Sequence, residues 1–227
     1  MRISIVIPVI NEAPRISQAI ERAWQAGADE VVVVDGGSDD RTAEIAGHCR
    51  CQLVRSPVGR AVQQNRGAEI ATGDTLLFLH ADNWLEPHAV QQIRQALADP
   101  HVHCGAFRQS IEARGCLYRL LQWGNGLRVR LRGLAYGDQG IFIRRQLFEE
   151  IGRFPDVPLM EDLILMQRLR RSTWPVLLDG PLHVDARRWQ RHGVIPQTIR
   201  NWCLVTAYCL GISTQRLAHL YQRHDSP

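Results

Sequence analysis

The chain has 227 residues, of which 45% are hydrophobic and 22% charged, and its formal net charge is +4. This composition is typical of a folded globular protein and excludes a disordered or collagen-like chain. Every basic side chain is arginine, which excludes mechanisms that need a lysine amine. The arginines are spread along the chain, so nucleic acid is not expected as a partner. The six cysteines lack metal-binding spacing and are expected to be reduced thiols.

Apolar, strand-like runs alternate with helix-like segments, a pattern typical of βαβ units around a parallel sheet. In the first half we expect strands near 3–8, 30–35, 52–55 and 75–79, and helices near 14–26, 40–47, 59–71 and 86–98. In the second half we expect strands near 104–111, 141–144 and 174–178, a loop at 152–158, and helices near 117–131, 161–171, 195–210 and 213–223. Since no linker or repeat interrupts this order, we expect a single domain, with its main part at 1–190 and a C-terminal helical segment of the same domain at 191–227.

Polar residues follow the ends of three apolar strands, at 8–12, 35–40 and 80–83. In parallel sheets the ligand crevice lies beyond the carboxyl ends of the strands. Asp35 directly follows four valines, and Gly36 and Gly37 allow a ligand to approach the backbone. The alternative is that 35–40 is only a turn and a helix cap, a role that suits Asp40 and Thr42.

Several short motifs carry a resemblance to a known family. They lie at 5–12, 33–42, 65–68, 71–74, 77–82, 151–154 and 160–162. In this order and spacing they resemble family 2 glycosyltransferases, whose fold is the GT-A (nucleotide-diphospho-sugar transferase) fold. Gly137-Asp138-Gln139 and Arg187-Arg188-Trp189 are similar to motifs of a small, soluble bacterial branch. The resemblance implies an α/β fold with a mostly parallel central sheet flanked by helices and a C-terminal helical appendage.

The resemblance also implies roles at the donor site. Those for the nucleotide fall on Pro8, Glu12, Asp35, Arg60 and Asn65. A divalent cation, Mn²⁺ or Mg²⁺, would be held by Asp82, which matches the last position of the family's D-x-D element. His80 stands where that element has its first acid. Imidazole suits Mn²⁺ better than Mg²⁺, so His80 is either a contact of the metal or ribose or only a histidine at a strand end.

At the acceptor side the resemblance assigns Asp162 as the general base. A carboxylate at a helix N-terminus is favoured in its ionised form, which a base requires. Asp138, Gln139 and Glu161 would line the acceptor or sugar pocket, and Arg188 with Trp189 would contact the diphosphate. Because only Arg-Trp remains of the Gln-x-x-Arg-Trp element of longer relatives, we expect single transfer rather than processive synthesis.

The sequence therefore predicts an inverting, metal-assisted transferase that moves one sugar from a UDP- or GDP-sugar to a hydroxyl acceptor, small or lipid-linked. One alternative is a catalytically weak protein that binds nucleotide sugars or docks on a membrane. A sugar nucleotidyltransferase is less favoured, because Asn11-Glu12-Ala13-Pro14 lacks the glycine-rich loop and basic residue such enzymes use.

The apolar stretch at 201–210 is too short to span a bilayer, and so is the run at 3–10. These lengths predict a cytoplasmic protein. With Arg200, Trp202, Tyr208 and Arg216 around it, the later stretch could lie at the inner face of a membrane. We favour instead a helix buried against the domain or in a homodimer, since Trp and Tyr are also common in cores and interfaces.

Overall fold

The computed structural model describes residues 1–221, and its N-terminal half is built from βα units. The strands are β1 (Ile3–Val9), β2 (Glu30–Asp35), β3 (Gln52–Arg55) and β4 (Thr75–Phe78), and the helices are α1 (Ile16–Gln25), α2 (Thr42–Gly47) and α3 (Arg60–Ile70). The four strands pair in the parallel order β3-β2-β1-β4. The strand and helix order expected for this half is confirmed.

The central strands are apolar on both faces because helices cover the sheet on both sides. Val31 and Val33 of β2 belong to one core, and Val32 and Val34 belong to a second core on the opposite face. Helix α3 packs so closely on this second face that a Cβ added to Gly67 would lie 2.3 Å from Val6. The glycine of the predicted 65–68 motif therefore sets the distance between α3 and the sheet.

The C-terminal half continues the sheet with mixed pairing. Its elements are β5 (Asn83–Leu85), α4 (Val90–Ala96), β6 (Cys104–Ile111), α5 (Cys116–Arg132), η1 (Gly137–Gln139), β7 (Phe142–Arg144), α6 (Arg145–Glu150), α7 (Glu161–Ser172), β8 (Val176–Val184), α8 (Arg187–His192), α9 (Val194–Cys209) and α10 (Thr214–Leu220). The full order is β3-β2-β1-β4-β7-β6-β8-β5, with β7 antiparallel to β4 and to β6, β8 parallel to β6, and β5 antiparallel to β8. Parallel pairing thus dominates only the N-terminal part.

Four elements of this half differ from the expectation. The strand expected at 174–178 is longer, because β8 continues past Gly180-Pro181 to pair with β5 and β6. Strand β5 and helices α6 and α8 were not expected. The last helix expected, at 213–223, is α10, and residues 222–227 lie outside the described part of the chain.

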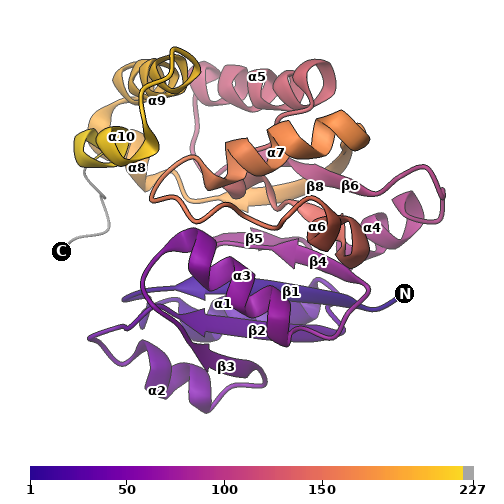
Figure 1. Ribbon diagram of the computed structural model, residues 1–227. Helices are drawn as coiled ribbons and strands as arrows, with labels where there is room; N and C mark the ends of the chain where they lie inside the picture. The colour runs from indigo at the N-terminus through magenta and orange to yellow at the C-terminus, as the bar shows by residue number, and fades with distance from the viewer. Residues whose placement is uncertain (222–227) are drawn as a thin grey trace.

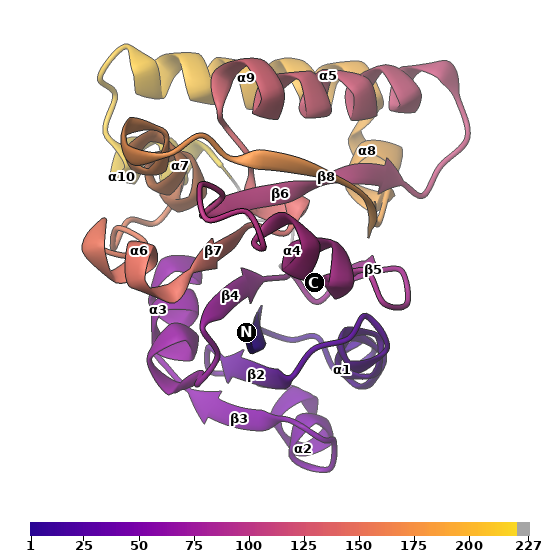
Figure 2. The ribbon, with the colours of Figure 1, turned by 90° about the vertical axis from the view of Figure 1, so that its right-hand side faces the viewer.

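The helices α5 and α9 form the outermost layer, at the top of Figures 1 and 2. The expectation that the 201–210 stretch is buried is correct for Leu204 and wrong for Trp202 and Leu210, which are 68% and 80% exposed. Within residues 1–221, no helix is long and apolar enough to cross a bilayer.

Candidate active site

The loops that follow β1 and β2 are tied to each other by side-chain to backbone hydrogen bonds. The backbone N–H of Asn11 donates to Ser38 Oγ at 3.0 Å, and that of Asp39 donates to Asn11 Oδ1 at 2.9 Å. Asp40 accepts from the backbone N–H groups of Thr42 and Ala13 at 2.9 and 3.1 Å. Asp40 therefore has the structural role considered as the alternative for this loop, that of a residue that holds the turn and the start of the next helix.

Asp35 lies at the end of β2, and only 2% of it is exposed. The backbone N–H of Ser38 donates to its Oδ1 at 3.2 Å, and the Ser38 hydroxyl donates to the same oxygen. These contacts account for the position of Asp35 within the folded chain, and its contact with a nucleotide stays a prediction. Pro8 of β1 pairs with Val34 of β2, the residue before Asp35. Pro8 and Asp35 therefore lie at the same end of the two parallel strands.

Gln63 is a residue of this edge that the sequence analysis missed. Its Nε2 donates to the carbonyls of Val9 and Val34 at 2.8 and 2.9 Å, which joins α3 to the ends of β1 and β2. A Cβ on Gly36 would lie 2.9 Å from the Gln63 amide. The glycine after Asp35 thus makes room for Gln63 as well as for any ligand.

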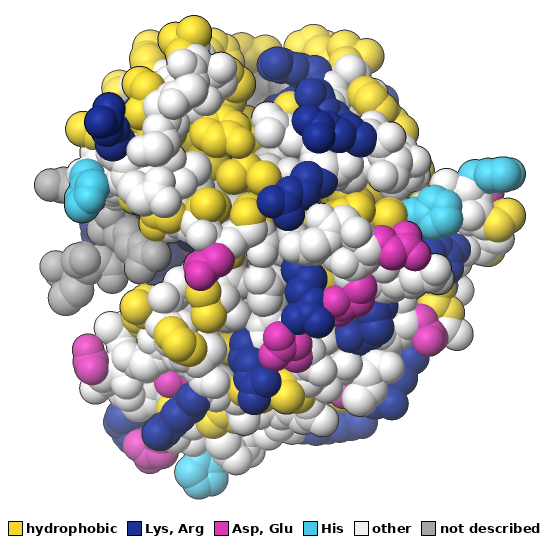
Figure 3. Space-filling model, in the orientation of Figure 1, with side chains coloured by type: hydrophobic (Ala, Val, Ile, Leu, Met, Phe, Trp, Pro, Cys, Tyr) yellow, Lys and Arg dark blue, Asp and Glu magenta, His cyan; other side chains and the backbone are white. Residues whose placement is uncertain are grey.

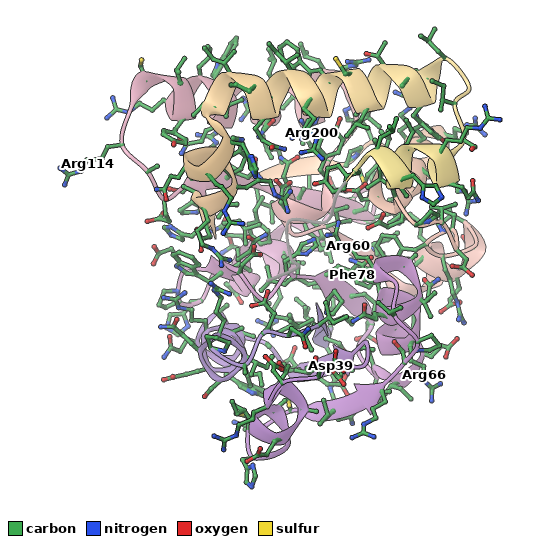
Figure 4. All side chains as sticks on the ribbon, turned by 90° about the vertical axis from the view of Figure 1, so that its left-hand side faces the viewer. Asp39, Arg60, Arg66, Phe78, Arg114 and Arg200 are labelled. Carbon is green, nitrogen blue, oxygen red and sulfur yellow. The ribbon has the colours of Figure 1, made fainter. Side chains whose placement is uncertain are left out.

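Arg60 and Asn65, both on α3, point to different partners. Arg60 Nη1 lies 3.5 Å from Glu161 Oε1, at the start of α7, and Figure 4 shows it between the N-terminal half and the layer of α9. Glu161 is 3% exposed, and burial raises the pKa of its carboxyl although Arg60 opposes the shift. Asn65 exchanges two hydrogen bonds with the backbone of Phe154, at 2.9 and 3.1 Å. Asn65 is thereby committed to the 151–160 loop, and its nucleotide role stays a prediction.

Asp162 and His80 meet at Gly137. The backbone N–H groups of Gly137 and Leu163 donate to Asp162 Oδ2 and Oδ1, at 2.7 and 2.6 Å. A Cβ on Gly137 would lie 2.8 Å from His80 Nε2 and 3.5 Å from Asp162 Oδ2. The end of β4, the η1 turn and the start of α7 therefore bring these two side chains to one point.

Asp138 and Gln139 belong to a polar network behind that point. Gln139 is fully buried, and its Oε1 accepts from Arg128 Nη2 at 2.6 Å. Arg128, from α5, also stacks on the Tyr136 ring at 3.6 Å. Gln109 Nε2 donates to the Asp138 carbonyl at 3.0 Å. Gln139 thus holds the turn in place and does not itself line an open pocket.

The carboxyl of Asp138 lies in surroundings that disfavour its charged form. Its Oδ1 is buried without a hydrogen-bond partner among the described residues. Burial raises the pKa of this carboxyl, while the Arg128 guanidinium opposes the shift. Asp162 and Arg188 also act on its charge, which places Asp138 in the same electrostatic cluster as the predicted base. A buried, unpartnered acid is typical of a site that completes its bonding with a ligand.

Asp82 faces Arg187, an arginine that the sequence analysis did not select. Arg187 Nη2 lies 3.9 Å from Asp82 Oδ2. Glu12 is close to both: burial raises the pKa of its carboxyl, Arg15 and Arg187 lower it, and the charge of Asp82 raises it further. The ends of β1 and β4 and the start of α8 therefore converge.

The two residues that follow Arg187 contact other parts of the protein. Arg188 Nη1 donates to the Tyr221 hydroxyl at 3.1 Å. Trp189 lies in a small hydrophobic cluster with Ile111 and Val184, and only 9% of it is exposed. The structure thus brings Arg188 near Asp138 and places Trp189 in a small core, and the diphosphate contact of both residues stays a prediction.

The chain is similar in sequence to known glycosyltransferases. Residues 4–152 match the model of glycosyl transferase family 2. The PGL/p-HBAD biosynthesis glycosyltransferase of Mycobacterium bovis (strain BCG) is 34% identical over 212 residues, 86% of this chain and 79% of the relative. The undecaprenyl-phosphate 4-deoxy-4-formamido-L-arabinose transferase of Edwardsiella ictaluri is 28% identical over 155 residues, 63% of this chain. The match spans about half of that relative, 48% of its length.

Solved structures share the fold at low sequence identity. The S. aureus TarS 1-349 complex with UDP has a TM-score of 0.66 at 16% identity, over 82% of this chain and 60% of that one. The mannosyltransferase PcManGT from Pyrobaculum calidifontis, in complex with GDP-Man and Mn²⁺, has a TM-score of 0.59 at 20% identity, over 80% of this chain and 56% of that one. The chain has the GT-A fold and belongs to glycosyl transferase family 2.

Proposed function

We propose that this protein transfers a single sugar from a nucleotide diphosphate sugar to a hydroxyl acceptor, with inversion at the anomeric carbon. Family membership supports the reaction class. The observation that carries the proposal is the position of Asp162, whose carboxylate is fixed by two backbone N–H groups beside His80 and Gly137. A base must be held in one orientation to accept a proton during displacement.

The donor nucleotide is proposed to bind at the sheet edge formed by Pro8, Glu12 and Asp35. The solved complexes of related fold contain UDP and GDP-Man, so the donor is taken to be a UDP- or GDP-sugar. Arg60 and Arg187 bring positive charge to the two sides of the crevice, next to Glu161 and Asp82 respectively. Guanidinium groups bind diphosphate oxygens bidentately.

A divalent cation is consistent with the donor atoms at the end of β4. The side chain of Asp82 is 38% exposed and offers carboxylate oxygens, the ligands that Mg²⁺ and Mn²⁺ accept. Within residues 1–221 no three His, Cys, Asp or Glu side chains are grouped to hold a metal, so most ligands would come from the diphosphate. Asp82 is the proposed ligand, with His80 as the second candidate. When bound, such an ion neutralises charge on the departing diphosphate.

Asp162 is proposed to take the acceptor proton. The acceptor oxygen attacks the anomeric carbon from the face opposite the diphosphate, the bond to the diphosphate oxygen breaks with its electron pair, and the hydroxyl proton passes to Asp162. Asp138 and Glu161 lie close enough to Asp162 for their charges to interact with it. Burial raises the pKa of both carboxyls.

The experiment that tests this proposal is Asp162→Asn, which keeps the size of the side chain and removes its basicity. We expect donor binding to be unchanged by calorimetry and the release of UDP or GDP to fall by ~10²- to 10⁴-fold. The release can be measured with water as the acceptor. Asp179→Asn is the matched control, because Asp179 is 85% exposed and paired only with Arg108. Near wild-type release by Asp162→Asn would refute the role of Asp162, and donor binding without release by the wild type would favour a binding protein.

A further inference from the structure

Helix α9 has apolar side chains on both sides: Leu204, Val205 and Tyr208 pack inward, and a second apolar stripe faces outward. Ile195, Ile199 and Trp202 lie on one stripe of the helix and are 56%, 52% and 68% exposed. Gln197, on the other side, is 1% exposed. Arg200 also lies on the inner side, with its guanidinium 5.2 Å from the centre of the Tyr221 ring (Figure 4). A surface helix normally turns its apolar stripe inward, so this outer stripe needs a partner.

Helix α5 also has an apolar outer side, in addition to Val129, which lies in the core. Its outer residues Leu120, Trp123 and Leu131 are 61%, 65% and 68% exposed. Its polar residues Asn125 and Arg128 point inward, where they hydrogen-bond to each other and to Gln109 or Gln139. Helix α5 therefore contains polar residues, but it places these two on its inner side and leaves apolar residues on its outer side.

The two helices together form one apolar face. We call it the α5–α9 face and define it by Leu117, Leu120, Trp123, Leu131, Ile195, Ile199, Trp202 and Leu210. Figures 1 and 2 both place α5 and α9 in the same top layer, and Figure 3 shows hydrophobic side chains gathered there. Of the exposed large hydrophobic residues in the described chain, only Met1 and Val58 precede α5. Such a concentration marks an interaction surface rather than scattered exposure.

Positive charge surrounds this face, and negative charge is absent from its helices. No Asp or Glu occurs at 116–132 or at 186–221. A cavity of about 410 Å³ beside Trp123 is lined by Arg119 and Arg130 and by Arg108, which pairs with Asp179 at 3.0 Å. Arg114, just before α5, points away from the body of the molecule (Figure 4). Apolar side chains with interfacial tryptophans and an arginine rim complement the surface of an anionic bilayer.

The charge pattern also distinguishes a bilayer from a second copy of the chain. A twofold interface would place the arginine rim of one copy against that of the other, with no acid on α5 or α9 to compensate. We propose that the α5–α9 face docks on the surface of an anionic phospholipid bilayer, with Trp123 and Trp202 at the level of the headgroups. The inner side of α5 carries the network that holds Gln139, so the docked face is the outer wall of the candidate active site.

The test uses the full chain and vesicles of phosphatidylcholine, with and without phosphatidylglycerol, and it needs no sugar donor. Its failure is therefore distinct from failure of the proposed transfer. We expect the protein to sediment with the phosphatidylglycerol vesicles and to remain in solution with phosphatidylcholine alone. Trp123→Glu and Trp202→Glu should each weaken binding about tenfold or more, with unchanged melting temperatures because both side chains are largely exposed. Arg130→Glu should weaken binding to the phosphatidylglycerol vesicles.

Val58→Glu is the matched control, since Val58 is 55% exposed and lies outside the α5–α9 face. It should bind vesicles like the wild type. Absence of binding to phosphatidylglycerol vesicles would overturn the proposal, and so would equal loss by Val58→Glu and Trp202→Glu. A stable dimer in sedimentation velocity without lipid, dissociated by Trp202→Glu, would assign the face to a second copy and would also overturn it.

Discussion

The contact at Gly137 gives a direct test of the site geometry. In Gly137→Ala the added methyl carbon would lie 2.8 Å from His80 Nε2. Nonbonded carbon and nitrogen atoms pack at about 3.5 Å, so the imidazole has to retreat by about 0.7 Å. Overpacking of this kind costs about 1–3 kcal/mol of unfolding free energy. The φ of Gly137 is not in the left-handed region, so no backbone strain adds to this cost.

Urea unfolding and donor turnover measure the two consequences of Gly137→Ala. We expect lower stability and slower turnover, because His80 and the Gly137 N–H both adjoin Asp162. Gly124→Ala in α5 is the control: apart from its own helix backbone and chain neighbours, no atom of the described residues lies within 4 Å of the added methyl group, so it should stabilise the helix by about 0.5–1 kcal/mol.

A double-mutant cycle with His80→Ala isolates the contact. Removing the imidazole makes room for the methyl group, so Gly137→Ala should cost less in the His80→Ala background. The two substitutions should deviate from additivity by about 0.5–3 kcal/mol. If the costs simply add, His80 does not lie against Gly137 and the reasoning about this site is refuted.

Two further outcomes are expected. Arg187→Gln should lower the affinity for UDP or GDP about tenfold by calorimetry, corresponding to ~1.4 kcal/mol, whereas Arg191→Gln on the same helix should not. Burial of Glu30 would raise its pKa, but hydrogen bonds from Ser4 and Thr72 outweigh this and hold the pKa below the ordinary value of 4.5. The carboxylate therefore stabilises the fold above pH 4.5 and loses this effect as the pH falls through its lowered pKa. Glu30→Gln should cost about 1–2 kcal/mol in urea unfolding at pH 7, and the difference from wild type should shrink in acid.

The N-terminal half could be predicted from the sequence because its signals are local. Strands β1, β2 and β4 are apolar runs followed by polar residues, and the four strands pair in parallel in the order β3-β2-β1-β4. Strand β5 has no such signal: its three residues become a strand by pairing with β8, about a hundred residues later in the chain. The end of β8 was missed because Gly180-Pro181 is a pair that normally ends a strand.

The candidate site was predictable where a residue acts directly after a strand or at the start of a helix. Asp82 and Asp162 are of this kind. Gln63 and Arg128 act through the helices that carry them, reaching carbonyls or amides of other segments. Their roles depend on how closely α3 and α5 approach the sheet, which no local pattern specifies. Arg187 was missed because the family motif places its arginine directly before the tryptophan, where Arg188 stands.

The polarity of α9 shows a more general limit of periodicity. A period of 3.6 residues identifies two faces of a helix but not which face meets the rest of the protein. In α9 the inner face combines Leu204 with Gln197, which donates to Asn201 at 2.9 Å, and Arg200, which stacks on Tyr221. The cost falls on the outer face, where each Å² of apolar surface left in water forgoes about 25 cal/mol. That unused free energy is what a bilayer surface would recover, which is why the exposed tryptophans of the α5–α9 face are the most sensitive probes of docking.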